Sequence, residues 1–502
     1  MIRTIYGESL ADPVNGNHRG KVYQVFDGTG VLTSNTYDFK GNLLGSTRHI
    51  ANEYQQTPHW DVIDGITDVD AIWTVAQSSL QSQSYFSNVE YDALNRVVKS
   101  MTPDGSVTRP FYNEANLLER LELNHRGRGT FTPIVNNIDY NARGQRTIIE
   151  YANGVETSYE YDPFTFRMTR LVSMRSSDSM KLQDYRYTFD PVGNIVVFRD
   201  NSDWSHLFTR QPVSGDGQYV YDPLYRLVQA TGREHPGQQP KHTDPVRGTV
   251  PHQNDLQALL RYTEQYEYDE AGNITGMTHT ADSNSWSRAY QYSTTSNKLL
   301  GTSAPGDPPG TYSYTYTYNP HGSMITMPHI SLLNWNYAEQ LESTDLGGGG
   351  IVYYCYDSSG NRSRKVYEHS GVTEDRVYLG GYEIYRKTRA GTVELERETL
   401  HVSDNTKRIL LFETKIVDTE HPAGLPQIRQ RWQLDNHLGS SSIELDINAQ
   451  VISYEEYHPF GSTSFHTVDS GAEVSAKRYR YTGKERDYET GLYYYGARYY
   501  AN

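Results

Sequence analysis

The chain has 502 residues, a net charge of −15, 43 tyrosines and a single cysteine. Nucleic-acid binding needs clustered Lys and Arg to displace counterions from phosphate, so an acidic chain without a basic run excludes it. One cysteine also excludes an internal disulfide framework, and Cys355 is expected to be a small buried residue.

The first 50 residues are expected to form strands, because "GKVYQVFDGTGVLTSNTYDFKGN" holds two turns, at Asp27–Gly30 and Asp38–Gly41. They contain no apolar core of signal-peptide length, and no run approaches the roughly 18 apolar residues that span a bilayer, so direct membrane insertion is not expected. Residues 51–84 form an acidic insertion without the aspartate spacing of a calcium loop, and a solvated loop or a short helix is expected there.

A six-residue pattern recurs from residue 37 onward: an aromatic residue, Asp or Asn, two variable residues, Gly or Asn, and often Asn or Arg. The Asp or Asn side chain bonds the backbone two residues on, and Gly or Asn accepts the left-handed conformation that closes a hairpin. The pattern therefore predicts hairpin turns. The residues expected to form them are Tyr37, Asp38 and Gly41; Tyr91, Asp92 and Asn95; Tyr140, Asn141 and Gly144; Asp190 and Gly193; Tyr268, Asp269 and Gly272; Tyr318, Asn319 and Gly322; and Tyr356, Asp357 and Gly360.

Three further copies start at Tyr112, Tyr161 and Tyr221, and in the last two Thr165 and Tyr225 stand where glycine is expected. At these two copies a different turn or a bulge is expected. Successive copies start 21 to 54 residues apart, which leaves room for two strands and two turns with insertions. The sequence therefore predicts an all-β fold, an array of antiparallel β-hairpins.

The most regular copy is "YSYTYTYNPHG", residues 312–322, in which four tyrosines occupy every second position. This period predicts one strand with a tyrosine face and a hydroxyl face. Tyrosine offers a large apolar ring and a hydroxyl that can stay in water, and aliphatic residues are scarce. The composition therefore favours a long sheet with two accessible surfaces over a thick core.

A Pro-, Gly- and His-rich stretch at 232–256 is expected to be a solvated loop, because His235, His242 and His252 lack the tight spacing of a zinc site. No metal and no cofactor is expected. Residues 255–265, "DLQALLRYTEQ", are expected to form a short helix.

From residue 376 the sequence carries more charge and alternates cleanly, which predicts regular antiparallel strands. We therefore expect two domains, a hairpin array at 1–375 and a C-terminal region at 376–502. Glu455 and Glu456 alternate along a strand, so their carboxylates are expected on opposite faces, a poor acid and base couple. Asp487 is expected to have a turn or salt-bridge role.

The C-terminal region contains "NHLGSSS", "YEEYHPFGS" and "YTGKERDYETGLYYYGARYY". These segments resemble the core region associated with Rhs repeats, and the Tyr-Asp hairpins resemble the YD repeats that precede it. "YDFKGNLLGSTRHIANEY" and "ERETLHVSDNTKRI" further resemble the fused B and C components of insecticidal Tc toxin complexes. The resemblance covers nearly the whole chain and implies a spiralling sheet that closes as a hollow shell around an unfolded toxic C-terminal polypeptide.

The resemblance also implies the partners, namely the encapsulated toxin polypeptide and the remaining shell or toxin-complex subunits, and it implies a protein that is secreted or delivered by a toxin-complex or secretion apparatus. Many members of the family cut themselves with aspartates that lie after the final "ARYY". This chain is therefore expected to have no catalytic residues and to be no enzyme. Two alternatives stay open: part of an autoproteolytic toxin precursor, and a cell-surface adhesion module whose tyrosines bind glycans weakly.

Overall fold

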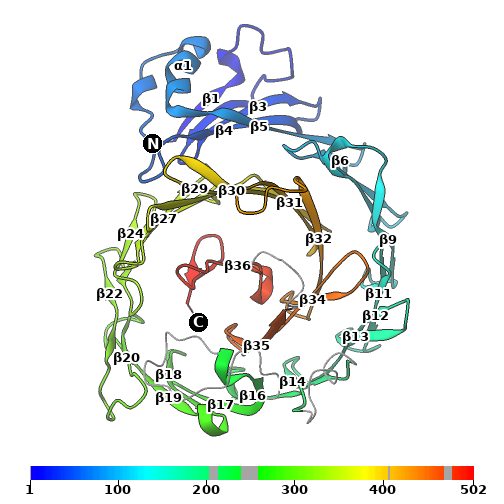
Figure 1. Ribbon diagram of the computed structural model, residues 1–502, viewed down its shortest axis with the longest axis vertical. Coiled ribbons are helices and arrows are strands. Elements are labelled where there is room, and N and C mark those ends of the chain that lie inside the picture. Colours follow the sequence, from blue (N-terminus) through cyan, green and yellow to red (C-terminus); the bar gives the residue numbers. More distant parts are fainter. Residues whose placement is uncertain (1, 203–212, 239–257, 405–406, 469–476, 502) are drawn as a thin grey trace. The chain divides into compact units, whose positions relative to one another are not determined.

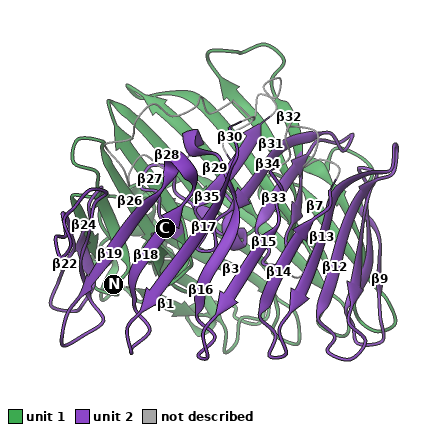
Figure 2. Ribbon diagram, turned by 90° about the horizontal axis from the view of Figure 1, so that it is seen from below, with its two compact units in different colours: residues 1–134, 330–430, 494–500 green, residues 135–329, 431–493, 501–502 purple. Residues whose placement is uncertain are grey.

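The computed structural model describes residues 2–202, 213–238, 258–404, 407–468 and 477–501, and their regular secondary structure is mainly β-strand (Figure 1). The chain divides into two compact units, coloured separately in Figure 2. Unit 1 comprises residues 1–134, 330–430 and 494–500, and unit 2 comprises residues 135–329, 431–493 and 501–502. The domain boundary at 375/376 stays a prediction.

Unit 1 contains α1 (Val69–Ala76) and short 3-10 helices at Gly7–Ser9, Asp61–Ile63, Gln77–Ser79 and His125–Gly127. Its strands are β1 (Arg3–Tyr6), β2 (Val22–Asp27), β3 (Gly30–Tyr37), β4 (Leu43–Ala51), β5 (Leu80–Tyr91), β6 (Val97–Met101), β7 (Val107–Tyr112), β8 (Leu118–Asn124), β24 (Leu332–Trp335), β25 (Leu341–Asp345), β26 (Ile351–Tyr356), β27 (Arg362–His369), β28 (Val372–Tyr378), β29 (Tyr382–Arg389), β30 (Thr392–Ser403), β31 (Arg408–Asp418) and β38 (Tyr499–Tyr500).

Unit 2 contains 3-10 helices at Pro236–Gln238, Asp282–Asn284 and Tyr481–Gly483 among its described residues. Its strands, given with β9, β32 and β37 that cross a unit boundary, are β9 (Thr132–Tyr140), β10 (Arg146–Tyr151), β11 (Val155–Tyr161), β12 (Met168–Arg175), β13 (Met180–Phe189), β14 (Ile195–Asp200), β15 (Gly217–Tyr221), β16 (Leu227–Glu234), β17 (Leu260–Tyr268), β18 (Ile274–Thr280), β19 (Trp286–Tyr292), β20 (Leu299–Thr302), β21 (Tyr314–Thr315), β22 (Thr317–Tyr318), β23 (Met324–Thr326), β32 (Gln427–Asp435), β33 (Ser441–Leu445), β34 (Val451–Tyr457), β35 (Thr463–Val468), β36 (Glu485–Arg486) and β37 (Tyr493–Tyr494).

Consecutive strands pair antiparallel, each with the next along the chain. In unit 1 the strands β1 to β8 form one such meander and β24 to β31 a second. In unit 2 the strands β9 to β21 form one and β32 to β35 another. The predicted all-β array of antiparallel hairpins is confirmed.

Each unit packs its second meander against its first. In unit 1, Nη1 of Arg364 on β27 donates to the carbonyl of Ala51 on β4 at 2.8 Å. In unit 2, Nε2 of Gln183 on β13 donates to Oγ of Ser442 on β33 at 2.9 Å, and all five residues of β33 are buried. The expectation of a sheet with two accessible surfaces is therefore wrong for these strands, because polar side chains bond across the two layers.

A solvated loop or a short helix is expected in the acidic insertion at 51–84. The structure has the short helix, α1. Asp68 caps the helix by accepting a hydrogen bond from the N–H of Ala71 at 2.8 Å. Ile72 packs with Trp60 and Phe26 in a small apolar core of unit 1. Within the described part of the chain, no helix has both the length and the hydropathy that a membrane span needs.

Two local expectations are wrong. Residues 260–265 belong to strand β17 and not to a helix, because β17 pairs with β16 and β18 and buries alternate residues such as Tyr262 and Glu264. Residues 255–257 of the expected helix lie outside the described residues. The tyrosine-rich stretch forms two short strands, not one. Its first half, β21, pairs with β20, whereas its second half, β22, pairs with β23.

Candidate functional site

The repeat turns share one hydrogen-bonded geometry. The N–H of Asp38 donates to the carbonyl of Asn42 at 2.9 Å, and the N–H of Gly41 donates to the carbonyl of Asp38 at 3.0 Å. Oδ1 of Asp38 accepts from the N–H groups of Lys40 and Asn42 at 2.8 and 2.9 Å. The same two backbone bonds occur at the other expected turns, which start at Asp92, Asn141, Asp190, Asp269, Asn319 and Asp357.

The last position of the pattern holds the second carboxylate oxygen. Nδ2 of Asn273 donates to Oδ2 of Asp269 at 2.8 Å, and Nε of Arg96 donates to Oδ2 of Asp92 at 2.6 Å. The hydrogen bonds from Asn273 hold the pKa of Asp269 below its ordinary value. The preference for Asn or Arg at this position therefore has a physical cause.

The repeat tyrosines tie neighbouring hairpins together. The hydroxyl of Tyr268 donates to the carbonyl of Leu227 at 2.7 Å, and Leu227 is the first residue of the strand that leaves the preceding turn. The same relation joins the pairs Tyr37–Val22, Tyr112–Val97, Tyr221–Ile195, Tyr318–Leu299, Tyr356–Leu341 and Tyr457–Ser441. Each of these hairpins is thus fixed to its neighbour by a side chain in addition to the strand pairing.

The two irregular copies differ from each other. Tyr225 adopts φ of 64° and keeps the ordinary closing bonds, so no different turn forms there. The bulge-like register shift at Val220/Tyr221 is one that regular copies also have, for example at Glu90/Tyr91. At the other copy the turn is one residue longer, because the N–H of Asp162 donates to the carbonyl of Arg167 and Phe166 takes φ of 59°. A different turn at Thr165 is therefore confirmed.

Sequence reasoning missed further turns of the same kind, among them those that start at Asn336, Asn436, Asp446 and His458. In the first three the residue before the turn is Trp, Asp or Leu instead of Tyr, and in the last His replaces Asp. The signal that could have found them is the left-handed residue three positions after the start. It is Gly439 in the second of these turns and Ala449, with φ of 57°, in the third.

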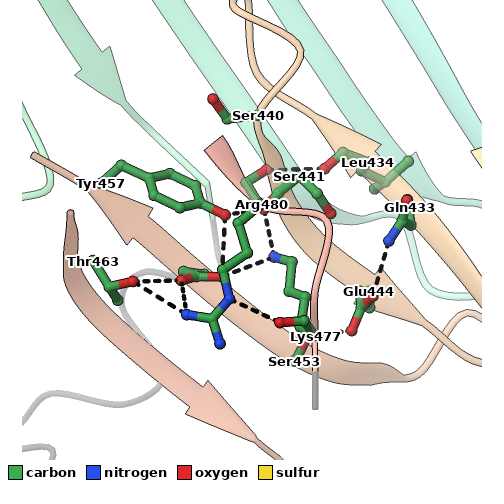
Figure 3. A network of polar contacts seen from close by, with 12 residues as sticks. Gln433, Leu434, Ser440, Ser441, Glu444, Ser453, Tyr457, Thr463, Lys477 and Arg480 are labelled. Carbon is green, nitrogen blue, oxygen red and sulfur yellow. Dashed lines mark hydrogen bonds and ion pairs between the residues drawn. The ribbon is translucent and has the colours of Figure 1, made fainter. Parts of the chain in front are cut away.

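A buried polar network lies among strands β32 to β35 of unit 2 (Figure 3). Glu444 is 0% exposed and accepts hydrogen bonds from Nη2 of Arg431 at 2.6 Å and Nε2 of Gln433 at 2.9 Å. Burial alone raises the pKa of Glu444, but Arg431 and Lys477 outweigh it and hold the pKa at about 2. Glu444 is therefore ionised at neutral pH and forms a buried ion pair with Arg431.

The second carboxylate of the network, Glu455, attaches the C-terminal segment, residues 477–493, to β34. Oε1 of Glu455 accepts from Oγ1 of Thr463 at 2.6 Å and from Nη1 of Arg480 at 3.1 Å, and Nζ of Lys477 lies 3.3 Å from Oε2 (Figure 3). Burial raises the pKa of Glu455, but the charges of Arg480 and Lys477 produce a net lowering. Two cations of the C-terminal segment thus neutralise a buried carboxylate of the sheet.

The three motifs of the C-terminal region meet around this network. The N–H of Thr482 donates to Oγ of Ser440 at 2.9 Å, which joins "YTGKERD" to "NHLGSSS". The hydroxyl of Tyr481 donates to the carbonyl of Pro459 at 2.7 Å, and the hydroxyl of Tyr493 to the carbonyl of Gly461 at 3.2 Å. These bonds join the C-terminal segment to "YEEYHPFGS". The contacts of residues 477–493 with strands β32 to β35 and their turns are called the clamp below.

Comparisons with known proteins agree with this fold and motif set. The chain is 29% identical over 516 residues to toxin subunit YenC2 of Yersinia entomophaga, a match that covers 99% of this chain and 51% of the relative. It is 33% identical over 427 residues to toxin subunit YenC1 of the same organism, covering 79% of this chain and 41% of the relative. The chain thus spans about half or less of the length of these relatives. No family model matches the chain.

Solved structures show the same relation. The TcdB2–TccC3 structure matches 100% of this chain and 24% of its own chain, with a TM-score of 0.85 and 28% identity. The pore of the Photorhabdus luminescens Tc holotoxin matches 99% of this chain and 23% of its own, with the same TM-score and identity. The chain is similar to Tc toxin subunits over nearly all of its length and has the fold of the matching part of TcdB2–TccC3.

Unit 2 has a cavity of about 360 Å³, lined by residues that include Asp200, Arg233, Glu455 and Glu456. Burial raises the pKa of Asp200 to about 6. Glu456 is paired with Arg233, whose Nη2 lies 2.5 Å from Oε1, and Glu455 is paired with Arg480. The described lining therefore supplies a weak acid, but Glu455 and Glu456 are each neutralised by an arginine.

Other residues considered from the sequence have structural contacts. Glu455 bonds Arg480 and Glu456 bonds Arg233, and the placement of their carboxylates on opposite faces of the strand stays a prediction. Asp487 is 0% exposed and closes a turn, with its N–H donating to the carbonyl of Leu492 at 2.9 Å. Cys355 is buried, and burial raises the pKa of its thiol to about 12, so it is an inert side chain.

The histidine-rich stretch is only partly described. His235 is fully buried and stacks on Phe465 with ring centroids 6.5 Å apart, so the expectation of a solvated loop is wrong at this residue. His242 and His252 lie outside the described residues.

Proposed function

We propose that the chain is a wall segment of a Tc-type shell that encloses and shields a toxic polypeptide, together with further shell or toxin-complex subunits. The observation that carries this proposal is the match of the whole chain to TcdB2–TccC3, whose structure is also known without its hypervariable C-terminal region, with a TM-score of 0.84. The proposed role is structural, in a toxin complex that is exported or delivered by its own apparatus.

Strand pairing and the hydrogen bonds from the repeat tyrosines, called the hairpin ties, stabilise the proposed wall. Each strand pairs with its neighbours, so unpaired edges that would aggregate are few along the meander. The tyrosine hydroxyls add a hydrogen bond between successive hairpins, as that of Tyr268 does to the carbonyl of Leu227. A wall of this kind resists local opening, which a container for a protease-sensitive chain requires.

The same ties favour the container over a glycan-binding surface. A tyrosine platform for sugars needs an exposed ring with a free hydroxyl, whereas the hydroxyls of Tyr221 and Tyr318 already donate to backbone carbonyls. The clamp also favours a non-enzymatic role, because its carboxylates Glu444 and Glu455 are each held by an arginine.

Protease protection tests the proposal. The complete gene product that contains this chain is treated with trypsin, natively and after unfolding in guanidinium chloride, and fragments are identified by mass spectrometry. We expect the C-terminal polypeptide to survive in the native sample and to be cut after unfolding. Cutting at the same rate in both samples would contradict enclosure. Glycan arrays probed with the same protein test adhesion separately.

A further inference from the structure

A cluster of histidines and carboxylates outside the clamp joins the two meanders of unit 2. Glu234 lies at the end of β16, His279 on β18, and His458 starts the turn after β34. Their side chains are between 0 and 4% exposed as residues, and one nitrogen or oxygen of each lies within 4.8 Å of the others. Glu234 and His279 are 45 positions apart in the sequence, and His279 and His458 are 179 positions apart. No local sequence motif therefore predicts the cluster.

One oxygen of Glu234 accepts a hydrogen bond from Nδ2 of Asn284, and its other oxygen, Oε2, faces the two imidazole rings. Nε2 of His279 lies 3.0 Å and Nε2 of His458 lies 3.5 Å from Oε2 of Glu234. Among the described residues, neither Oε2 of Glu234 nor Nε2 of His279 has a hydrogen bond of acceptable geometry. Tetrahedral zinc with bonds of about 2.0–2.2 Å sets its ligand atoms about 3.3 Å apart, which matches these separations.

A second carboxylate lies behind both imidazole rings and is hydrogen-bonded to that of His279. Oε1 of Glu264 on β17 lies 3.2 Å from Nδ1 of His279 and 3.4 Å from Nδ1 of His458. A histidine that binds a metal through one nitrogen usually gives the proton of the other to a carboxylate, which fixes its tautomer. Glu264 occupies that position for two rings, and it is itself held by a hydrogen bond from the hydroxyl of Tyr266.

The remaining described surroundings of His279 are aromatic, and the neighbouring arginine is already paired. His279 is stacked against Trp286 with ring centroids 5.1 Å apart, and Tyr262 stacks on it at 5.5 Å. The neighbouring Arg233 is committed to Glu456. Two buried carboxylates need compensation by positive charge. A divalent cation bound by neutral imidazoles would balance the charge of both carboxylates.

We propose that Glu234, His279 and His458 bind a zinc ion, with Glu264 as the residue that positions the two imidazoles. Two histidines and a glutamate are a donor set that zinc uses in proteins. The ion links β16 and β18 of the first meander to the turn after β34. It thereby assigns a role to His458, the residue that replaces Asp at the start of the "HPFGS" turn.

Zinc retention tests this site. The 502-residue chain is loaded with Zn²⁺, dialysed against metal-free buffer and analysed by mass spectrometry of the metal. We expect one zinc per chain, and a more than tenfold loss of retained zinc in E234Q, H279Q and H458Q. H18Q is the control, because His18 is also a buried histidine but bonds only backbone carbonyls in unit 1, and it keeps the wild-type zinc content.

Two further measurements keep the test decisive if a variant does not fold. Added Zn²⁺ raises the melting temperature of the wild-type chain, and Co²⁺ in place of Zn²⁺ gives the visible absorption of a four-coordinate site. E264Q binds zinc with roughly 10- to 100-fold lower affinity, as expected for a positioning residue. A wild-type chain that retains no zinc, or cluster variants that retain as much as H18Q, would overturn the proposal.

Discussion

Gly461 and Tyr481 are in such close contact that a Cβ added at position 461 would lie 2.5 Å from Cδ1 of the tyrosine ring. Gly461 also has φ of 97°, a conformation that side chains other than glycine rarely adopt. The glycine of "HPFGS" is therefore the point at which the aromatic residue of "YTGKERD" docks on the sheet.

Replacing this glycine by alanine should loosen the clamp. G461A is expected to destabilise the protein by about 2–4 kcal/mol, from left-handed strain and from overpacking against Tyr481. Urea unfolding followed by circular dichroism measures the change. The matched control is G439A, since Gly439 has φ of 73° but a Cβ added there would meet no atom within 4 Å. Equal effects for both variants would show that the contact with Tyr481 contributes nothing.

The tyrosine ties can be tested by removing one hydroxyl. Y268F keeps the ring but leaves the carbonyl of Leu227 without its side-chain partner, which is expected to cost about 1 kcal/mol. Y225F is the control because Tyr225 is 60% exposed, and it should change stability by less than about 0.5 kcal/mol. Thermal unfolding of the three proteins gives the comparison, and a Y268F protein as stable as Y225F would contradict the tie.

The strained turn at Tyr225 predicts a stabilising substitution. Asn tolerates φ of 64° better than Tyr, so Y225N should raise the unfolding free energy by about 0.5–1 kcal/mol. L224N changes the exposed neighbouring residue and should be nearly neutral. Chemical denaturation distinguishes the two, and a Y225N protein that is less stable than wild type would show that the ring has contacts that outweigh the strain.

The ion pair of Glu444 and Arg431 predicts a pH dependence. The pKa of Glu444 is about 2 in the folded protein and near 4.5 in the unfolded chain, so between these values the unfolded chain binds more protons. The stability contributed by Glu444 is thus complete above about pH 4.5 and is lost as the pH falls toward 2. E444Q leaves Arg431 buried without its charge partner and should cost about 3–5 kcal/mol at pH 7.

Urea unfolding at pH 7, 5, 4 and 3 checks this prediction. The difference in stability between wild type and E444Q should shrink as the pH falls below 4.5. The exposed Glu270 provides the control, and E270Q should stay close to wild type at each pH. A difference for E444Q that is the same at pH 7 and pH 3 would contradict the assignment.

The turns are the part of the fold that can be predicted from sequence, because their chemistry is local. Asp38, Gly41 and Asn42 lie within five residues and make their bonds with one another. The same local reasoning is wrong at Tyr225, where strand pairing on both sides imposes the ordinary turn on a residue that resists it. It is also wrong at residues 260–265, where a helix-like composition is overridden by burial between two strands.

The buried polar sites cannot be predicted in this way, because their members are distant in the sequence. The sequence shows Glu455 only as half of an acidic pair, and nothing local indicates that Arg480 neutralises it. The same holds for Glu234 and His458, which approach each other only after the second meander packs on the first. Motifs such as "YEEYHPFGS" show in which part of the sequence these residues lie. Which side chains meet there depends on the register of the strands.

Single-particle imaging of the complete gene product tests the enclosing wall most directly. The account predicts a continuous wall of antiparallel hairpins with additional density inside it for the enclosed polypeptide. A wall without internal density, or a C-terminal polypeptide that lies outside in solvent, would contradict it.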